Sequence, residues 1–460
     1  MINFRLFIPI VLLPLILIVI YFSLGFPQNN IFFITNCLIL IFSFLGMFLH
    51  PLKLYSLVKV VFIFIFIFFG LVPLIHQVNN LVLYGNELHI LDKINANFII
   101  LIGMMFFIAG SYLKASFFDK LINSLPEIKK LNIIYIIIFF LISLLILYKW
   151  NFDLKLLIFR GVGEVMSDHL IFKNDIDTNY SPKISYHFYS KFIRPMPIIL
   201  LVIFTYFYKK NINTYNNKQK LKNSILFLVI LLISVFLTFP TGIDRLQTAT
   251  YYIPFIIIFT KLWEKPFMMQ LTLTGGVLTA FEFLDKFRNF DYQKFNFKIN
   301  MNFLKKGHFD AYENFVRAIE VDFITYGYQL KGALLFFIPR FLWKEKPIGS
   351  GSTLANQLDY VFGGIAMPFI GEGYVNYGAI GSFLFMLLLG IILGNLDRLA
   401  WSLKNSNKDC LFLYYYYFLF GLVFFLMRGD LLNSVAFIIA MTASFWLLVL
   451  VLKFAARLRI

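Results

Sequence analysis

This sequence has few charged residues, and acidic residues are the scarcest. Only 14% of its 460 residues are charged, with 24 Asp and Glu against 41 Lys and Arg. Soluble domains contain about 25% charged and roughly 45–50% apolar residues, whereas 60% of this chain is hydrophobic. The composition therefore excludes an ordinary soluble globule, and the 59 Phe exclude a disordered chain.

Cysteine clusters, paired histidines and phosphate-binding loops are also missing. The two cysteines, Cys37 and Cys410, fall in apolar runs, which argues against a disulfide framework or a Cys-based metal site. The six His show no His-x-x-x-His spacing, which argues against zinc. The absence of a Gly-x-x-x-x-Gly-Lys-Ser/Thr loop excludes a nucleotide-binding cassette of that type.

The chain has instead a series of long apolar runs. A bilayer core about 30 Å thick needs roughly 20 apolar residues per helix, and open sheet edges cannot be satisfied in lipid. We predict an all-α polytopic membrane protein, a single transmembrane domain over 1–460 with about twelve spans (range ten to fourteen). The first run lacks a small-residue cleavage site, so we interpret it as a retained helix. The predicted spans are 6–25, 31–50, 54–75, 96–113, 132–148, 195–208, 224–240, 249–260, 266–281, 378–396, 411–427 and 434–452.

The basic residues are concentrated in alternate loops. With the N-terminus inside, the seven inner segments hold 20 Lys/Arg and 5 Asp/Glu, whereas the outer segments hold 21 Lys/Arg and 19 Asp/Glu. The reversed orientation would contradict the positive-inside rule. We therefore predict cytoplasmic termini, and we interpret Lys clusters such as that in 209–222 as topology anchors and not as a nucleic-acid site.

Two outer loops, 149–194 and 282–377, carry most of the polar sequence. The second is long enough that such a loop is usually functional. Within it, 332–339 and 362–371 are apolar but too short to span. We expect them to be re-entrant or to lie at the interface, and packing within a folded cap is the alternative. The near absence of ionisable residues inside the spans argues against an ion-coupled transporter.

Arginine is concentrated on the predicted outer face, whereas lysine divides almost evenly. Because a guanidinium grips phosphate oxygens in two places, this bias points to a lipid phosphate or diphosphate ligand. For each Arg, pairing with one of the 19 outer acids is the alternative. The seven outer Arg, of eleven in all, are Arg160, Arg194, Arg245, Arg288, Arg317, Arg340 and Arg428.

Candidate proton acceptors lie in the second loop. Glu372 precedes a predicted span, and Asp310 lies close to His308. A carboxylate or His at the mouth of a site can accept a proton from a sugar hydroxyl, and a salt bridge is the alternative for either acid. In the first loop, Asp175-Ile-Asp177 has the form of a divalent-metal clamp, although this spacing also arises by chance in polar loops.

Five segments carry motifs, in order: Phe239-Pro-Thr-Gly-Ile-Asp-Arg245-Leu-Gln-Thr-Ala-Thr, Phe309-Asp310, Gly332-Ala-Leu-Leu-Phe-Phe-Ile-Pro-Arg340 with the following Lys-Pro-Ile-Gly-Ser-Gly, Gly371-Glu-Gly-Tyr-Val-Asn-Tyr-Gly and Arg428-Gly-Asp430-Leu-Leu. Together they resemble the O-antigen polymerases, the Wzy-type oligosaccharide repeat-unit polymerases. Arg340 to Gly351 also has the Arg-x₁₀-Gly spacing of that family's outer loops. The first loop has no Gly at the matching distance from Arg160.

The resemblance implies a membrane glycosyltransferase of lipopolysaccharide biosynthesis. It would transfer a growing glycan from an undecaprenyl-diphosphate carrier onto a new carrier-linked repeat unit, at the periplasmic face of the bacterial inner membrane. The implied fold is that of multispanning, GT-C-like transferases that use lipid-linked sugars, with no metal and no cofactor. The implied partners are the glycan donor and acceptor and membrane lipid, and a chain-length regulator protein is a further candidate.

This chemistry assigns roles to residues. The leaving diphosphate needs cations that stabilise its developing charge, and the acceptor hydroxyl needs a base, for which Glu372 is the first choice, then Asp310 or His308. The cation candidates are Arg340, Lys346, Arg245, Arg288 and Arg428. Orientation of sugar or of the second diphosphate falls to Arg194, Arg317, Tyr312 and Tyr374.

Two other functions stay open at this point. An O-antigen ligase of the same superfamily would use the same donor and transfer the finished glycan to lipid A core, so only the motifs favour a polymerase. A flippase for the lipid-linked repeat unit would need polar residues inside the spans and an internal two-fold repeat, and the sequence shows neither.

Overall fold

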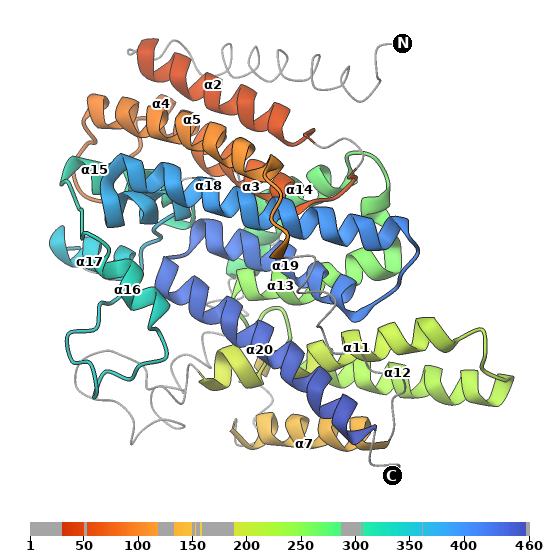
Figure 1. Ribbon diagram of the computed structural model, residues 1–460. Helices are drawn as coiled ribbons and strands as arrows, with labels where there is room; N and C mark the ends of the chain where they lie inside the picture. Colours follow the sequence, from red (N-terminus) through yellow and green to blue (C-terminus); the bar gives the residue numbers. More distant parts are fainter. Residues whose placement is uncertain are drawn as a thin grey trace, which may run out of the picture.

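The computed structural model describes residues 30–49, 53–117, 133–149, 152, 157–158, 188–286, 304, 307–360 and 362–456. These residues form helices and connecting loops, with no strand among them. The helices lie side by side as a bundle (Figure 1). The predicted all-α class is therefore confirmed for the described ranges.

Seven helices in these ranges are long and apolar enough to cross a membrane, so the chain is a polytopic membrane-embedded protein. Two shorter apolar helices accompany them, α2 (Asn30–Gly46) and α7 (Ile133–Lys149). The seven are Leu57–Val78 (α3, Leu57–Ile65; η1, Phe66–Leu71; α4, Val72–Val78), Ile90–Tyr112 (α5), Tyr189–Asn211 (η3, Tyr189–Ile193; α11, Met196–Asn211), Asn217–Leu237 (α12), Phe369–Asn405 (α18), Leu411–Arg428 (α19) and Leu431–Ala455 (α20).

Two predicted spans, 249–260 and 266–281, are helical but do not belong to these seven. The first is covered by α13 (Arg245–Phe255) and η4 (Ile256–Thr260), which together are short. The second corresponds to α14 (Met268–Lys286), whose last turns carry charged residues. Because the predicted span 6–25 lies outside the described residues, the total of about twelve stays a prediction.

The span Leu57–Val78 forms the centre of the bundle, and every residue from 57 to 70 is buried. A helix that is apolar all round belongs in an interior. Two side chains satisfy its first N–H groups: Ser56 Oγ accepts from Lys59 at 3.2 Å, and the Asp397 carboxylate accepts from Leu57 and Val58 at 2.8 and 3.2 Å. An acid of α18 thus fixes where the central helix begins.

Small residues bring α5 and α18 into backbone contact. A Cβ on Gly390 would lie 2.3 Å from the Phe107 carbonyl oxygen, and one on Gly394 would lie 2.3 Å from that of Ser111. From the other side, a Cβ on Gly110 would lie 2.3 Å from the carbonyl oxygen of Leu387. Small residues allow such close approach of membrane helices, and here they fix α18 against the rest of the bundle.

The helix α18 consists of two pieces joined at a sharp bend. Tyr377 and Gly378 have non-helical backbone angles, and the φ of +65° at Gly378 is a conformation that glycine adopts readily. The chain folds back at this point, because Ser382 Oγ donates to the Ile370 carbonyl at 2.8 Å. Residues 369–376 therefore form a short helix packed against the start of the long one. The predicted apolar piece 362–371 leads into this bend.

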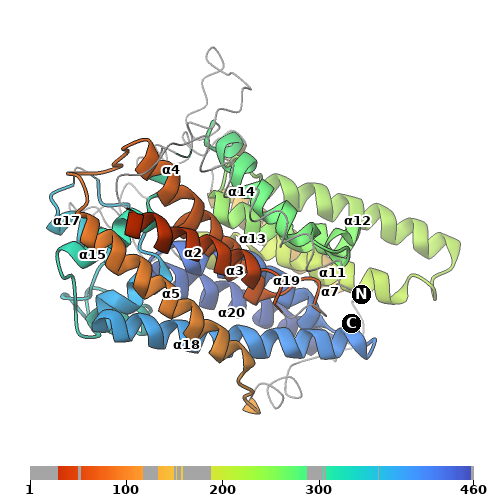
Figure 2. The same cartoon turned by 90° about the horizontal axis from the view of Figure 1, so that it is seen from above.

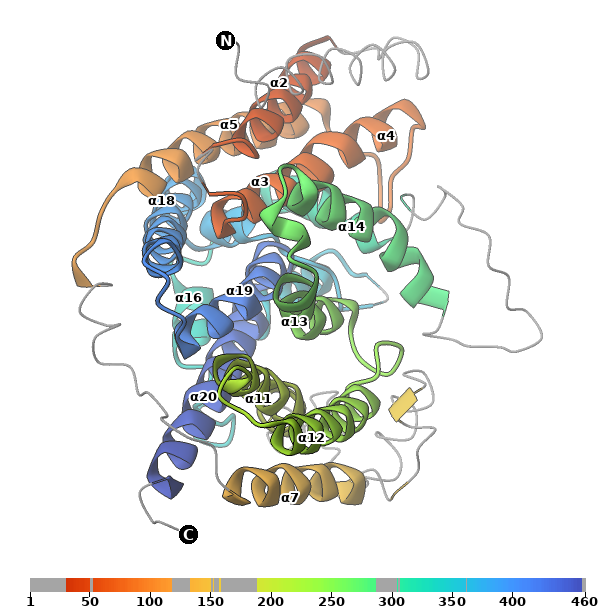
Figure 3. The same ribbon diagram turned by 90° about the vertical axis from the view of Figure 1, so that its right-hand side faces the viewer.

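The loops divide between the two ends of the bundle. Figure 1 shows three short helices of segment 282–377 together at one end: α15 (Ala311–Glu320), α16 (Tyr328–Leu334) and α17 (Ser350–Gln357). The connections from α11 to α12 and from α18 to α19 lie at the opposite end (Figure 2). The Lys-rich segment 209–222 belongs to that second end. Figure 3 shows α7, α11 and α12 as a group on the far side of the bundle from α2 and α5.

Candidate functional site

Four of the predicted site residues meet at the end of the bundle that carries α15. Arg245 begins α13, and Arg428 ends α19. The other two flank Phe309: His308 lies in the turn η7 (Gly307–Phe309), and Asp310 immediately precedes α15. We call Arg245, His308, Asp310 and Arg428 the polar network.

Hydrogen bonds connect the network in a chain. Arg245 Nη2 lies 3.0 Å from His308 Nε2. Arg428 donates from Nε to the His308 carbonyl oxygen at 3.1 Å and from Nη2 to Asp310 Oδ1 at 3.3 Å. Two guanidinium groups from separate helices therefore converge on one short turn, which concentrates positive charge at this end of the bundle.

Asp310 is the buried anchor of the network. Its side chain is only 2% exposed, and its second carboxylate oxygen accepts from the Ala366 N–H at 3.2 Å. Burial raises the pKa of Asp310, and the nearby Arg428 and the Ala366 N–H oppose that rise without cancelling it. A buried carboxylate is costly unless it is paired, so Asp310 and Arg428 depend on each other.

The neighbours of Asp310 explain why it lies here. Phe309 points into the core and stacks on Phe68, with ring centroids 5.2 Å apart. Ala366, whose N–H donates to Asp310, is held by α15 as well, because the Asn314 side chain donates to the Ala366 carbonyl oxygen at 2.8 Å. An apolar residue beside a polar one thus places the carboxylate at the edge of the core.

Glu372 is completely buried. One carboxylate oxygen accepts from the Ser350 hydroxyl at 2.8 Å, and the other accepts from the Leu431 N–H at 2.8 Å. Leu431 is the first residue of α20, three residues beyond Arg428. Glu372 therefore ties the starts of α17, α18 and α20 together, an arrangement that favours a positioning role over a proton-accepting one.

The Gly349-Ser350-Gly351 segment, where α17 begins, fits closely between these elements. A Cβ on Gly349 would lie 2.7 Å from the carboxylate of Asp430, and one on Gly351 would lie 2.2 Å from the Ile365 carbonyl oxygen. Asp430 in turn caps α20 by accepting from the Asn433 N–H at 2.9 Å. The two glycines therefore allow the start of α17 to pack closely against Asp430 and Ile365.

Arg340 and Lys346 are engaged with their own loop. Arg340 donates to the carbonyl oxygens of Lys346 at 2.6 Å and Pro347 at 3.2 Å, and Lys346 donates to those of Phe336 at 2.5 Å and Ile338 at 2.9 Å. Desolvation and the neighbouring Arg340 lower the pKa of Lys346. These two cations lock a loop, and the structure does not join them to the polar network.

The four residues assigned to orientation make internal contacts. Arg194 is buried and donates to the Gly242 carbonyl at 3.0 Å, which holds the segment before Arg245. Tyr312 donates to Asn97 Oδ1 at 2.9 Å, and Tyr374 donates to Asp322 Oδ1 at 3.2 Å; both rings are buried.

Arg317, the last of the four, works with Glu313 on the loop between α4 and α5. Arg317 donates to the Tyr84 carbonyl at 3.0 Å, and Glu313 accepts from the Leu83 and Tyr84 N–H groups, each at 2.9 Å. Burial raises the pKa of Glu313, although both N–H groups oppose this. One turn of α15 therefore fixes this loop beside the network.

The loop between α4 and α5 places Tyr84 beside the polar network, and this residue was not predicted from the sequence. Tyr84 forms a cluster with Tyr360 and Phe362, at centroid distances of 5.7 and 4.9 Å, and Phe362 is 46% exposed. Burial and then the nearby Asp310 carboxylate raise the pKa of Tyr84. A Cβ on Gly307 would lie 1.8 Å from the Tyr84 hydroxyl. The cluster thus borders the network, but one Tyr among 25, in a short loop, gives no sequence signal.

Among the described residues, no group of three or more His, Cys, Asp or Glu could hold a metal ion. The predicted candidates Arg160, Arg288, Asp175 and Asp177 lie outside those residues, as does most of loop 149–194.

Searches with this sequence and structure found no matching family model, no matching curated protein and no matching solved structure.

Proposed function

We propose that this protein is a membrane glycosyltransferase that polymerises undecaprenyl-diphosphate-linked oligosaccharide repeat units into O-antigen or a related surface polysaccharide. The observation that carries the proposal is the polar network. Arg245, the His308–Asp310 turn and Arg428 come from three of the segments that resemble O-antigen polymerases, and they form one hydrogen-bonded group in a membrane-embedded bundle.

The network supplies what transfer from a lipid diphosphate requires. The acceptor hydroxyl oxygen forms a bond to the anomeric carbon of the donor, and the bond from that carbon to the diphosphate oxygen breaks. Arg245 and Arg428 stabilise the negative charge that develops on the leaving diphosphate. When the diphosphate draws the Arg245 guanidinium toward itself, the His308 ring nitrogen that Arg245 contacts becomes free, and the acceptor proton passes to that nitrogen. Asp310 holds Arg428 in place and so acts as a positioning residue.

The surrounding residues support this arrangement. Glu372 holds the α19–α20 turn through the Leu431 N–H, and so places Arg428. The aromatic cluster of Tyr84, Tyr360 and Phe362 offers a partly exposed apolar surface beside the network, on which the acceptor sugar ring packs. The reaction needs no metal or cofactor, because the diphosphate is already a good leaving group.

The proposal includes a location. The network lies at the end opposite the Lys-rich segment 209–222, and under the positive-inside rule this supports a location on the periplasmic side of a bacterial inner membrane. Both glycan substrates then reach it from the outer leaflet, and a chain-length regulator protein would approach from the same side.

A deletion strain examined on a glycan gel tests the function. Glycans with single repeat units indicate a lost polymerase, a lack of any repeat indicates a flippase, and carrier-linked polymer that is not transferred indicates a ligase. Complementation with Arg428→Ala should leave single repeats, and full-length chains from this variant at normal expression would contradict the proposed role of the network.

A further inference from the structure

The end of α16 and the loop that follows it expose large apolar side chains. Leu334 is 62% exposed, Phe337 67%, Phe341 75% and Leu342 70%. These side chains fall within the nine residues 334–342, and they lie at the end of the bundle that carries the polar network. Large contiguous apolar patches on a folded protein mark binding surfaces, so this loop has a partner that covers it.

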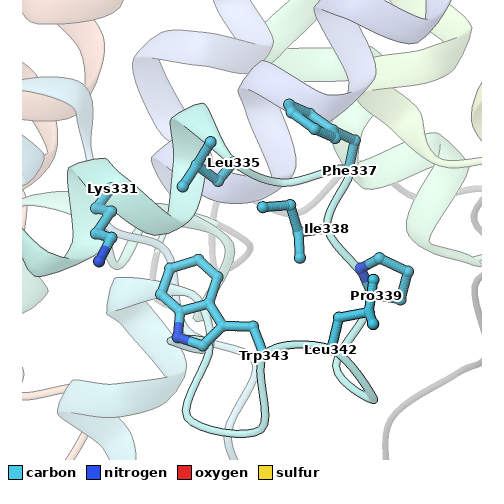
Figure 4. Close-up of a pocket in the computed structure, with 7 residues that line it drawn as sticks. All are labelled: Lys331, Leu335, Phe337, Ile338, Pro339, Leu342 and Trp343. Carbon is cyan, nitrogen blue, oxygen red and sulfur yellow. The ribbon is translucent and has the colours of Figure 1, made fainter.

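An open hollow of about 620 Å³ lies at the same loop. Leu335, Phe337, Ile338, Pro339, Leu342 and Trp343 line it, and Lys331 lies at its edge (Figure 4). The Lys331 ammonium is 5.3 Å from the centroid of the Trp343 ring. An apolar hollow with a cation at its rim suits a molecule that has a hydrocarbon chain and an anionic head.

Hydrogen bonds from side chains to backbone carbonyl groups within the loop hold its shape. The bonds from Arg340 to residues 346 and 347, and from Lys346 to residues 336 and 338, cross the loop in both directions. The Tyr328 hydroxyl donates to the Glu345 carbonyl oxygen, which adds a third link. These hydrogen bonds give the loop a fixed conformation, in which the apolar side chains are exposed.

Charge identifies the partner. Residues 331–346 contain four cations, Lys331, Arg340, Lys344 and Lys346, and a single acid, Glu345. Basic residues next to apolar and aromatic ones are typical of segments that lie in the headgroup region of a bilayer with anionic lipids. An apolar protein partner would not require this excess of positive charge.

We propose that the 334–346 loop inserts into the outer leaflet of the membrane and binds an anionic phospholipid there. One acyl chain of the lipid occupies the cavity, and Lys331 with Lys344 contacts its phosphate. The inference goes beyond the transferase function and does not depend on it, since it concerns the lipid that surrounds the protein and not a glycan substrate.

Spin-label depth measurement tests the insertion. The protein carries Leu342→Cys in a Cys37→Ala, Cys410→Ala background and is placed in nanodiscs of phosphatidylglycerol and phosphatidylcholine. Glu87→Cys, in an exposed polar loop at the same end, is the matched control. We expect the label at 342 to collide more with oxygen than with a water-soluble nickel chelate, and the label at 87 to show the reverse order.

A label at 342 that behaves like the label at 87 would overturn the inference, because the loop would then lie in water. A label shielded from both reagents would also overturn it, since the loop would then be covered by protein. No glycan substrate is present in this experiment, so its failure is distinct from a failure of the transferase proposal.

The lipid specificity has its own measurement. In native mass spectrometry of protein released from mixed nanodiscs, we expect phosphatidylglycerol to be retained over phosphatidylcholine, and Lys331→Gln with Lys344→Gln to abolish that preference. A double variant that still retains phosphatidylglycerol over phosphatidylcholine as strongly as the parent protein does would contradict binding of the phosphate at these cations.

Discussion

At the residue scale, the three candidate proton acceptors differ in how their side chains are placed. Glu372 and Asp310 are buried, and in each both carboxylate oxygens already accept a hydrogen bond. The ring of His308 is only partly buried, and its acceptor nitrogen meets Arg245, a cation that the diphosphate can draw away and so free that nitrogen. This favours His308 as the base, whereas the sequence alone favoured Glu372, because position in a motif does not reveal whether a side chain is enclosed.

The replacement His308→Gln tests this assignment. Gln can still accept a hydrogen bond from Arg245 but cannot take up a proton, so transfer should slow by about 10²–10⁴-fold. The unfolding temperature in detergent should stay close to that of the parent protein. His89→Gln, in an exposed loop residue at the same end, is the control and should polymerise normally. A normal rate from His308→Gln would assign the proton to another group.

The raised pKa of Asp310 gives a stability effect with a definite sign. Because burial lifts its pKa above the ordinary 3.8, the folded protein binds this proton more tightly than the unfolded chain does. The protonated form therefore adds stability at low pH, and this contribution is lost as pH rises from about 3.8 through the raised value. Over that window, thermal unfolding in detergent should show a decline that Asp310→Asn flattens. An identical pH dependence in the two proteins would rule out Asp310 as its source.

At the element scale, most helices could be predicted because apolar runs are local. The boundaries were less accurate, since α5 begins at Ile90 and not at 96: its first turn tolerates Asp92 and Lys93 at the membrane edge. The fold-back at Gly378 could not be predicted, because Ser382 reaches Ile370 only after the chain has turned. Hydropathy shows where a helix can exist, and tertiary contacts decide where it bends.

The contact between α5 and α18 leads to a prediction with a matched control. In Gly390→Ala the new Cβ would lie 2.3 Å from the Phe107 carbonyl oxygen, so the two helices must separate, at a cost of about 1–3 kcal/mol. In α14, a Cβ on Gly276 would have no atom of the described residues within 4 Å. Gly276→Ala should therefore be neutral or stabilising by up to about 1 kcal/mol, since Ala favours helix. Equal unfolding temperatures for the two variants would contradict the close packing.

At the scale of the whole molecule, the sequence located the candidate segments better than it assigned their roles. Arg245, His308, Asp310 and Arg428 were all named from the sequence, and the structure brings them together. Arg340 and Lys346 were favoured as diphosphate ligands because of their charge, yet the structure shows their donors bound to loop carbonyls. Tyr84 was missed, because its partners Glu313 and Arg317 lie 229 and 233 residues away in the sequence, a separation that no local pattern reveals.

The proposed reaction requires the polar network to lie on the periplasmic side of the membrane, and this depends on the orientation of the whole bundle. Tyr326 is 85% exposed at the end that carries the network, and Lys218 is exposed at the opposite, Lys-rich end. Single-cysteine variants at these positions, in the Cys37→Ala, Cys410→Ala background, can be labelled with a membrane-impermeant maleimide in bacterial cells whose outer membrane is permeabilised. We expect Tyr326→Cys to react in such cells and Lys218→Cys to react only after the inner membrane is lysed, because basic loops are retained in the cytoplasm. The opposite result would place Arg245, His308 and Arg428 in the cytoplasm, where the polymerase reaction proposed for them does not occur.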